Sequence, residues 1–228
     1  MSGVALSLNR VRAQLATALA NAGRAPGSAR LIAVSKLHPA SAIREAYAEG
    51  QRDFGENYVQ ELEQKAAELA DLSDLRWHMI GHLQRNKARV VAPLAALIHT
   101  VHSVELAREL DKRANAPLAV LIEVNVGGEA QKSGCAPEAL PELLRALAES
   151  ERLRCRGLMC VPPHTEDPSG SRPFFEKLRD LRDAHGGAER LPELSMGMSA
   201  DLPYAIAAGA SIVRVGTAIF GERPRAEN

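Results

Sequence analysis

A lysine just beyond a short apolar run is the residue of this sequence whose type and position most directly suggest chemistry. The aliphatic run Leu31–Val34 ends two residues before Lys36. We predict a buried strand over 31–36, and because side chains alternate along a strand, Lys36 should point the same way as Ile32 and Val34. A lysine removed from water has a lowered pKa, and its neutral amine can attack a carbonyl carbon. Lys36 is therefore a candidate for Schiff-base formation; the alternative is that it ends the strand and extends to water.

Hydroxyl and glycine residues suited to an anionic ligand follow two apolar runs near the C-terminus. Ser199 lies in the segment 195–201, and Gly216 and Thr217 lie in the segment 213–221. Hydroxyls donate hydrogen bonds to oxyanions, and a glycine lets the backbone approach one closely. A phosphate group suits these residues. A reactive lysine beside a phosphate site indicates either pyridoxal 5'-phosphate or a phosphorylated sugar as the ligand.

Eight short apolar segments are the predicted strands, and helical segments separate each strand from the next. The strands are predicted at 31–36, 53–57, 77–81, 97–101, 118–126, 153–161, 193–198 and 212–220, and the helices include 41–49, 59–69, 104–114, 137–150 and 173–185. Such an alternation favours a closed parallel barrel. We therefore expect one domain over 1–228, a (β/α)8 TIM barrel with an additional N-terminal helix. The alternative, a doubly wound open sheet, would favour a glycine-rich turn after the first strand, and residues 36–39 contain no glycine.

Polar residues at the predicted carboxyl ends of the strands are further candidates, because the loops at that end of a barrel carry its chemistry. Asn57 follows the second strand, His82 follows the third, and Lys132 lies in the glycine-rich loop after the fifth. Each alone has a structural explanation; His82, for example, suits the start of a helix. When a barrel closes, a site formed after its last two strands lies beside the first strand. The phosphate site and Lys36 should therefore face each other across one opening.

The composition limits the ligands and the environment. Twenty-eight basic residues balance 28 acidic ones, so no overall charge attracts nucleic acid or an anionic membrane. No apolar run approaches the length of a membrane span, and the N-terminus lacks the apolar core of a signal peptide. The three cysteines, Cys135, Cys155 and Cys160, lack the spacing of a zinc site and predict no structural disulfide. We expect a cytoplasmic protein without nucleic-acid or membrane partners.

Five blocks of the sequence carry a family resemblance. They are Ala33–Lys36, Phe54–Asn57, Trp77–Lys87, Ser195–Asp201 and Arg214–Gly221. In this order they closely resemble the pyridoxal phosphate homeostasis protein family, which is similar to the barrel domain of alanine racemase standing alone. The resemblance extends from about Leu31 to Gly221. It implies the barrel fold and pyridoxal 5'-phosphate as the cofactor.

The resemblance also implies roles for the matching residues. Lys36 would carry the cofactor as a Schiff base, and Asn57 would lie near its phenolic oxygen. His82 matches a motif residue whose role is less defined. The residues that would hold the phosphate are Ser199, Gly216 and Thr217.

Arg214 would face the pyridine nitrogen of the cofactor. It has the same strand parity as Gly216, so it should point into the barrel, while Val213 and Val215 should point toward the helices. An arginine is effectively always charged, and a buried charge needs a partner. The alternative to the pyridine nitrogen is an ion pair with an inward carboxylate such as Glu123.

Members of this family bind the cofactor without an established turnover. The resemblance therefore implies a carrier, buffer or regulator of pyridoxal phosphate in vitamin B6 homeostasis, with apo-enzymes that need the cofactor as partners.

The enzyme alternative is an amino-acid racemase or decarboxylase on the same barrel, in which a tyrosine from a second domain across a dimer serves the other face of the cofactor. We expect no second domain, no tyrosine at a strand end, a monomer and no turnover. A third alternative, a Schiff-base aldolase acting on a sugar phosphate, would not need Arg214 inside the barrel.

Overall fold

All eight predicted strands are present, and they close into a parallel barrel. This computed structural model describes residues 3–222. Each strand pairs with its neighbours in the chain, and β8 pairs with β1. The strands are β1 (Arg30–Val34), β2 (Asp53–Glu56), β3 (Arg76–Met79), β4 (Ala95–Val101), β5 (Leu118–Glu123), β6 (Leu153–Met159), β7 (Glu193–Ser195) and β8 (Ile212–Val215). The prediction of a (β/α)8 barrel is confirmed, and the open-sheet alternative is wrong.

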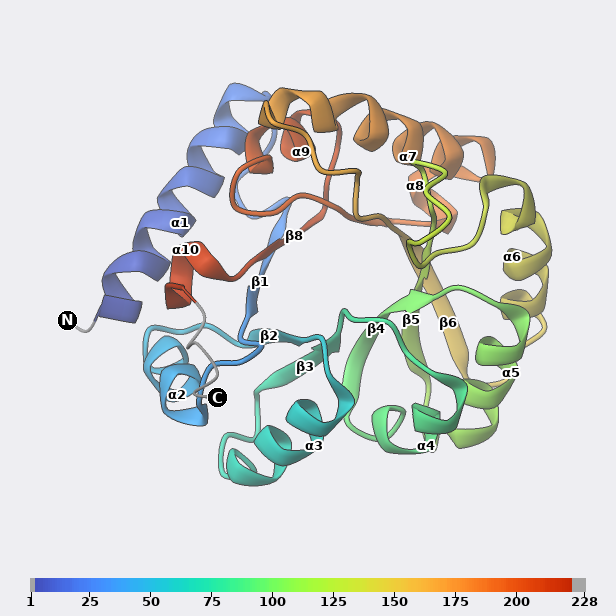
Figure 1. Cartoon of the computed structure of the whole chain (residues 1–228), viewed down its shortest axis with the longest axis horizontal. Helices are drawn as coiled ribbons and strands as arrows, with labels where there is room; N and C mark the ends of the chain where they lie inside the picture. Colours follow the sequence, from blue (N-terminus) through green and yellow to red (C-terminus); the bar gives the residue numbers. More distant parts are fainter. Residues whose placement is uncertain (1–2, 223–228) are drawn as a thin grey trace.

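The helices form the outer layer around the barrel (Figure 1). The α-helices are α1 (Gly3–Asn21), α2 (Ala40–Ala48), α3 (Val59–Glu68), α4 (Ala88–Val91), α5 (Val104–Arg113), α6 (Leu140–Ala148), α7 (Arg172–Ala184), α8 (Gly187–Arg190), α9 (Leu202–Ala207) and α10 (Thr217–Phe220). Short 3-10 helices are η1 (Arg85–Lys87), η2 (Pro137–Ala139) and η3 (Pro168–Ser171). At least one helix therefore lies between each strand and the next.

Several strands end earlier than predicted. β1 ends at Val34 instead of residue 36, and β5 ends at Glu123 instead of residue 126. The largest difference concerns the predicted strand 212–220: β8 ends at Val215, and the residues from Thr217 onward form α10. Strand pairing ends where the loops diverge to shape the opening of the barrel, whereas an apolar sequence pattern can continue beyond that point.

The additional N-terminal helix is also present as predicted. Its buried face includes Leu8, Val11, Leu15 and Leu19, at the spacing of an amphipathic helix. α1 packs against α2, α9 and α10 (Figure 1). Just after it, the Arg24 guanidinium donates hydrogen bonds to the carbonyl oxygens of Ile206 and Ala210 at 3.0 and 2.8 Å. These hydrogen bonds join the end of α1 to α9 and to the loop before β8.

The core has an outer and an inner part. Outward-facing strand residues such as Phe54 pack beneath the helices in one large apolar cluster. Inside the barrel lies a smaller apolar cluster formed by Ile32, Leu97, Leu121, Met159 and Ile212. Polar side chains share this interior: Asp53, His78, His99 and Arg214 are each at most 5% exposed. The barrel interior therefore contains both apolar and polar side chains, in part from the same strands.

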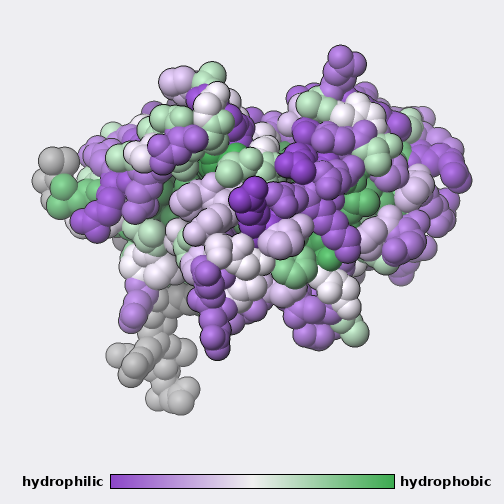
Figure 2. Space-filling view, turned by 90° about the horizontal axis from the view of Figure 1, so that it is seen from above, coloured by the Kyte–Doolittle hydropathy of each residue, from purple (hydrophilic) through white to green (hydrophobic). Residues whose placement is uncertain are grey.

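On the face of the molecule in Figure 2, hydrophilic side chains predominate, and strongly hydrophobic residues are seen mainly in recesses between them. Within residues 3–222, no helix has the length and apolar character needed to cross a membrane.

Candidate functional site

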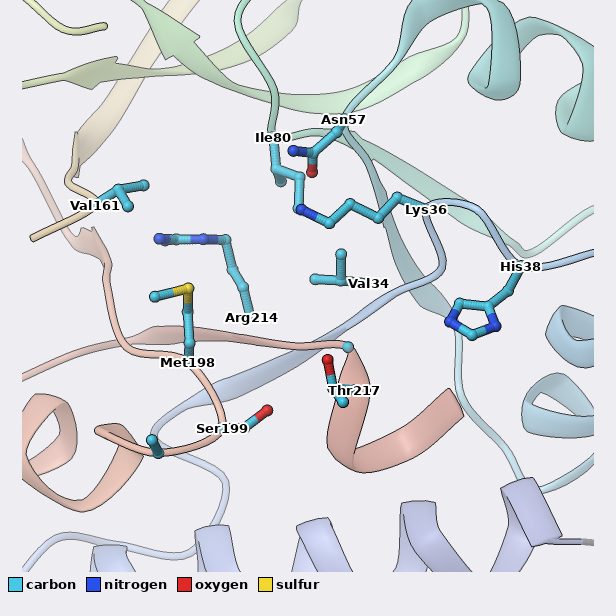
Figure 3. Close-up of a pocket in the computed structure, with 12 residues that line it drawn as sticks. Val34, Lys36, His38, Asn57, Ile80, Val161, Met198, Ser199, Arg214 and Thr217 are labelled. Atoms are coloured by element: carbon cyan, nitrogen blue, oxygen red, sulfur yellow. The ribbon is translucent and has the colours of Figure 1, made fainter. Parts of the chain in front are cut away.

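A cavity of about 410 Å³ opens at the carboxyl ends of the strands. Six of the seven candidate site residues line it: Lys36, Asn57, Ser199, Arg214, Gly216 and Thr217. They come from β8 and from the segments that follow β1, β2, β7 and β8. Figure 3 shows the lysine and arginine side chains extending across the middle of this cavity, with the two hydroxyl residues on one side of it. The predicted opposition of a lysine and a group of hydroxyls is therefore present.

Lys36 lies in the turn after β1, two residues beyond Val34, and not within the strand itself. Its side chain extends toward Ile80 and Asn57 (Figure 3). The residue is half-buried, whereas the two strand residues on its predicted face, Ile32 and Val34, are buried. Lys36 thus enters the cavity as expected, from a loop that is in contact with solvent.

Buried polar contacts hold the backbone on both sides of Lys36. The Ser35 hydroxyl donates to Glu56 Oε1 at 2.7 Å, and Lys65 Nζ donates to the Ser35 carbonyl oxygen at 2.8 Å. On the other side, the Leu37 amide donates to Glu61 Oε2 at 2.7 Å. Leu37 has a φ of 63°, which is costly for a residue other than glycine. The contacts to β2 and α3 therefore fix a strained turn that aims Lys36 into the cavity.

Lys65 is central to these contacts, because its Nζ also lies 2.8 Å from both Glu56 Oε1 and Glu61 Oε2. Burial raises the pKa of Glu56, and the Lys65 ammonium opposes that shift. We expect Lys65→Met to lower the free energy of unfolding by about 3 kcal/mol, because it leaves the buried Glu56 carboxylate without its cation. Chemical denaturation measures this. The matched control is Lys112→Met, an exposed lysine on α5; equal losses in both variants would contradict the structural role of Lys65.

The loop after β7 brings Ser199 to the cavity. The Asp201 carboxylate accepts a hydrogen bond from the Met198 amide at 2.5 Å and so closes a tight turn. Gly197 has a φ of 91°, and a Cβ atom on it would lie 2.4 Å from the Cβ of Ala205. Only glycine fits this position without displacement of α9. The turn leaves Ser199 exposed at the edge of the cavity.

Gly216 directly precedes α10 and Thr217 begins it, on the same side of the cavity as Ser199 (Figure 3). The amides of Ile219 and Phe220 bond back to the Gly216 carbonyl oxygen at 2.8 and 3.0 Å. The amides of Thr217 and Ala218 come before these in the helix, where amides have no acceptor within the helix. Backbone donors and the hydroxyls of Thr217 and Ser199 therefore gather at one end of the cavity, which is an arrangement suited to an oxyanion.

Arg214 points into the barrel, and Val213 and Val215 pack in the outer core, as strand parity predicts. Its Nη1 donates to Ser195 Oγ at 2.7 Å, and its Nη2 donates to the Cys160 carbonyl oxygen at 2.9 Å. Among the described residues its contacts are these two hydrogen bonds, and Glu123 acts on it only through its charge, so the alternative of a direct pair with Glu123 is wrong. The guanidinium is instead held by neutral acceptors.

Glu123 nevertheless lies in the electrostatic field of Arg214. It is 7% exposed, and its Oε2 has no hydrogen-bond partner among the described residues. Burial raises the pKa of Glu123 to about 7, and the positive charge of Arg214 opposes the shift. This carboxyl group therefore changes its protonation state near neutral pH, on the inner face of the barrel.

Asn57 lines the cavity, but His82 does not. A Cβ atom on Gly81 would lie 2.1 Å from the Asn57 carbonyl oxygen, so glycine lets the loop after β3 pack directly on the loop that carries Asn57. His82 is exposed; its ring stacks on His102 with centroids 4.7 Å apart, and its Nδ1 lies 3.0 Å from Ser133 Oγ. The structure thus gives His82 contacts between loops at the rim, outside the cavity.

Lys132 overhangs a neighbouring cavity. Its Nζ donates to the Pro162 carbonyl oxygen at 2.8 Å and forms an ion pair with Glu129 at 2.6 Å. Val161 and Met198 line both this neighbouring cavity and the cavity that contains Lys36. The two openings are therefore adjacent at the rim.

Several apolar lining residues were not singled out from the sequence. They are Val34, Ile80, Val161, Met198 and Ala200, and His38 joins them. Most of them lie directly after strands or in the loops at the carboxyl side, and this position could have indicated that they line the cavity. Apolar residues at strand ends are, however, common in any barrel, so the position alone does not distinguish them. The His38 ring lies beside Phe220 of α10 in a tilted arrangement, with ring centroids 5.3 Å apart.

The fold and this cavity define a class of protein, and comparison with known proteins agrees with it. Residues 6–224 match the family model described as alanine racemase, N-terminal domain. A crystal structure of alanine racemase from Corynebacterium glutamicum superimposes with a TM-score of 0.71 at 18% identity, covering 99% of this chain and 62% of that chain. At this identity the likeness shows the fold alone.

Closer relatives cover the full length. The pyridoxal phosphate homeostasis protein of Pseudomonas aeruginosa is 48% identical over 227 residues, which is 98% of this chain and 97% of the relative. The structure of PipY from Synechococcus elongatus with PLP bound has a TM-score of 0.78 and 42% identity, and covers 91% of this chain and 100% of that chain. The chain belongs to the family of pyridoxal phosphate homeostasis proteins.

Proposed function

We propose that this protein binds pyridoxal 5'-phosphate, carries it as a Schiff base on Lys36, and takes part in intracellular vitamin B6 homeostasis without turnover of its own. The observation that carries the proposal is the opposition, within one cavity, of the Lys36 amine and the hydroxyls and amides around Ser199 and Thr217. The ligand bound to PipY and the shared name of the curated relatives support it.

The residues of the cavity fit the chemical groups of this cofactor. Lys36 would bind its aldehyde carbon, and Ser199, Gly216 and Thr217 would hold its phosphate. Arg214 would donate to the pyridine nitrogen, and Asn57 would lie near the phenolic oxygen. When bound, the cofactor supplies an aldehyde that exchanges between amines. Because Ser199 and Thr217 are exposed, the phosphate end would remain in contact with solvent, and this suits a carrier from which the cofactor must be released.

The enzyme alternative lacks a tyrosine as its second acid/base group, and the histidine that lines the cavity, His38, comes from the same turn as Lys36. A racemase moves protons on both faces of its substrate, and in addition to Lys36 it would need such a group on the opposite side of the cavity. No tyrosine is among the cavity-lining residues within the described part of the chain. Tyr58 comes closest in sequence, directly after Asn57, but it is 51% exposed and does not line the cavity. A protein that binds and releases the cofactor therefore agrees better with these residues.

Spectroscopy and chemical labelling test the proposal. The protein purified from cells should be yellow, and borohydride reduction should leave a pyridoxyl group on Lys36 that peptide mapping can locate. A label found mainly on another lysine would overturn the assignment of Lys36. No label, together with no uptake of added pyridoxal phosphate, would overturn the proposed ligand.

Release of the cofactor provides a second expectation. Lys132, at the adjacent opening, would act as a transient acceptor of the aldehyde during loading or release. We expect Lys132→Ala to bind the cofactor normally but to transfer it to an apo-enzyme several-fold more slowly, because one intermediate amine is lost. The matched control is Lys177→Ala, since Lys177 Nζ also donates to a backbone carbonyl oxygen, that of Val126 at 2.9 Å. A wild-type rate of release and transfer in Lys132→Ala would contradict this role.

For the setting of this function, we propose the cytoplasm, a monomer, and apo-enzymes that depend on pyridoxal phosphate as partners. Size-exclusion chromatography with light scattering tests the monomer, and a dimer at micromolar concentration would contradict it.

A further inference from the structure

A continuous line of buried side chains crosses the barrel interior and ends at Arg214. His78 Nε2 lies 2.9 Å from Asp53 Oδ1, and His78 Nδ1 lies 3.0 Å from His99 Nε2. His99 Nδ1 lies 2.8 Å from Ser195 Oγ, which in turn accepts from Arg214 Nη1 at 2.7 Å. We call Asp53, His78, His99 and Ser195 the interior hydrogen-bond chain. It joins β2, β3, β4 and β7 to the arginine on β8.

The chemistry of its two ends fixes the direction of every hydrogen bond in this chain. Arg214 has only donors, so Ser195 Oγ must accept from it and is left with its own hydrogen to donate to His99 Nδ1. His99 then carries its proton on Nε2 and donates to His78 Nδ1. His78 carries its proton on Nε2 as well and donates to Asp53, which as an ionised carboxylate has only acceptors.

If the hydrogen bonds ran in the opposite direction, the same contacts would leave some groups without suitable partners. If His99 donated from Nδ1 to Ser195, the serine hydroxyl hydrogen would lose its acceptor in the chain. His78 would then have to donate from both nitrogens, as an imidazolium, to meet both His99 and Asp53. A second buried cation in the same interior as Arg214 would be costly.

The electrostatic surroundings agree with two neutral histidines. Burial lowers the pKa of His78, although the hydrogen bond and the charge of Asp53 oppose the shift, and Arg30 and Arg76 add to it. Burial also lowers the pKa of His99 well below its usual value, with further contributions from His78, Arg214 and Arg30. Burial alone would raise the pKa of Asp53, but the hydrogen bonds from His78 and Arg76 outweigh it and keep the carboxylate ionised.

We propose that the interior hydrogen-bond chain is a positioning device, which holds Arg214 as a fixed donor toward the cavity. Through this chain, the negative charge of Asp53 stabilises the buried positive charge of Arg214 from across the barrel. Hydrogen bonds in series polarise one another in a medium of low dielectric constant, so the effect of the carboxylate reaches the guanidinium through neutral groups. The Cys160 carbonyl oxygen holds the second nitrogen of Arg214. With both Nη1 and Nη2 held by hydrogen bonds, the guanidinium has one orientation relative to a ligand in the cavity.

This inference rests on the proposed function only in its last step, namely that the donor faces the ring nitrogen of pyridoxal phosphate. The direction of the chain can be measured without that ligand. In the full-length protein labelled with ¹⁵N-histidine, we expect His78 and His99 at neutral pH to be neutral and protonated on Nε2, with signals assigned through His78→Gln and His99→Gln. An imidazolium at His78, or a proton on Nδ1 of either ring, would overturn the proposed direction.

The positioning role is tested on protein loaded with ¹⁵N-labelled pyridoxal phosphate. We expect Ser195→Ala to shift the ring-nitrogen signal and to weaken cofactor retention by about tenfold, the effect of losing one hydrogen bond to a charged group. Ser195→Thr keeps the hydroxyl and should restore both. The control is Thr100→Val, which removes another buried hydroxyl, one that donates to the Gly81 carbonyl oxygen at 2.7 Å outside the chain.

The Asp53→Asn variant distinguishes positioning from stability, because a purely structural role of Asp53 would not change the ring-nitrogen signal of the cofactor. Asp53 does not line the cavity, yet its loss should move the ring-nitrogen signal in the same direction as Ser195→Ala. An unchanged signal in both variants, at equal occupancy, would overturn the proposal. Failure of wild-type protein to take up the cofactor would instead overturn the proposed function, and with it the last step, whereas the histidine measurement would still decide the direction of the chain.

Discussion

Replacing Lys36 with alanine is expected to abolish the borohydride-fixed pyridoxyl label and to reduce retained cofactor by about tenfold or more, because the proposed covalent bond between Lys36 and the aldehyde is lost. Lys36 is the lysine that lines the cavity, while the phosphate end of the site stays intact in the variant. Mass spectrometry after reduction measures the label, and gel filtration followed by absorption spectroscopy measures retention.

Two companion measurements make the Lys36 result specific. Lys87→Ala removes a half-buried lysine from η1 in the loop region after β3 and should keep the full label on Lys36. In Lys36→Ala, a preformed Schiff base of pyridoxal phosphate with methylamine should bind without a covalent bond, since the cavity no longer contains the competing amine. Persistence of the label on another residue of Lys36→Ala at the wild-type level would refute the assignment.

The barrel and the general position of its site could be predicted because both depend on local pattern. Alternation of short apolar strands with helices determines the fold class, and strand parity alone correctly oriented Arg214 inward. The same reasoning placed Lys36 within a strand, although it lies in a turn that depends on the positive φ of Leu37. No glycine marks that turn in the sequence. Contacts from Glu61 and Lys65, which lie on another element, stabilise it.

The interior hydrogen-bond chain could not be predicted, because its members are distant in sequence. His99 and Ser195 are 96 residues apart, and His78 and Asp53 are 25 apart. A histidine in an apolar strand gives no indication of which side chain it meets across a barrel. Lys65 is a similar case: the spacing from Glu61 suggests an ordinary surface pair on a helix, but tertiary packing buries it against Glu56.

The position of His82 shows the limit of reasoning from motifs. Its block matches the family and follows β3, as the other candidates follow their strands. Its side chain nevertheless contacts His102 and Ser133 at the rim. Matching a motif indicates that a residue is in the right region, but whether its side chain enters the cavity depends on the local backbone, which the motif does not reveal.

The second large effect is expected from Arg214→Glu, which should increase the exchange of the α-proton of added alanine in heavy water by about tenfold or more. A guanidinium that donates to the pyridine nitrogen prevents protonation of that nitrogen, so negative charge at the α-carbon of a bound amino acid is stabilised poorly. A glutamate at 214 can accept a hydrogen bond from a protonated ring nitrogen and so favours exchange. The wild-type protein should exchange the proton slowly while still exchanging one amine for another.

The control for Arg214→Glu is Arg214→Gln, which removes the charge but keeps an N–H donor and should leave exchange slow. Nuclear magnetic resonance of alanine measures the exchange, after cofactor occupancy is shown to be equal in all three proteins.

In Arg214→Glu the new carboxyl group would lie near Glu123, whose pKa burial already raises to about 7; two close carboxyl groups share a proton more readily than they both ionise. The measurement therefore belongs above neutral pH, where the new carboxyl group is ionised. Fast exchange by the wild type, or no gain in Arg214→Glu despite a protonated ring nitrogen, would show that Arg214 does not limit the chemistry of the bound cofactor.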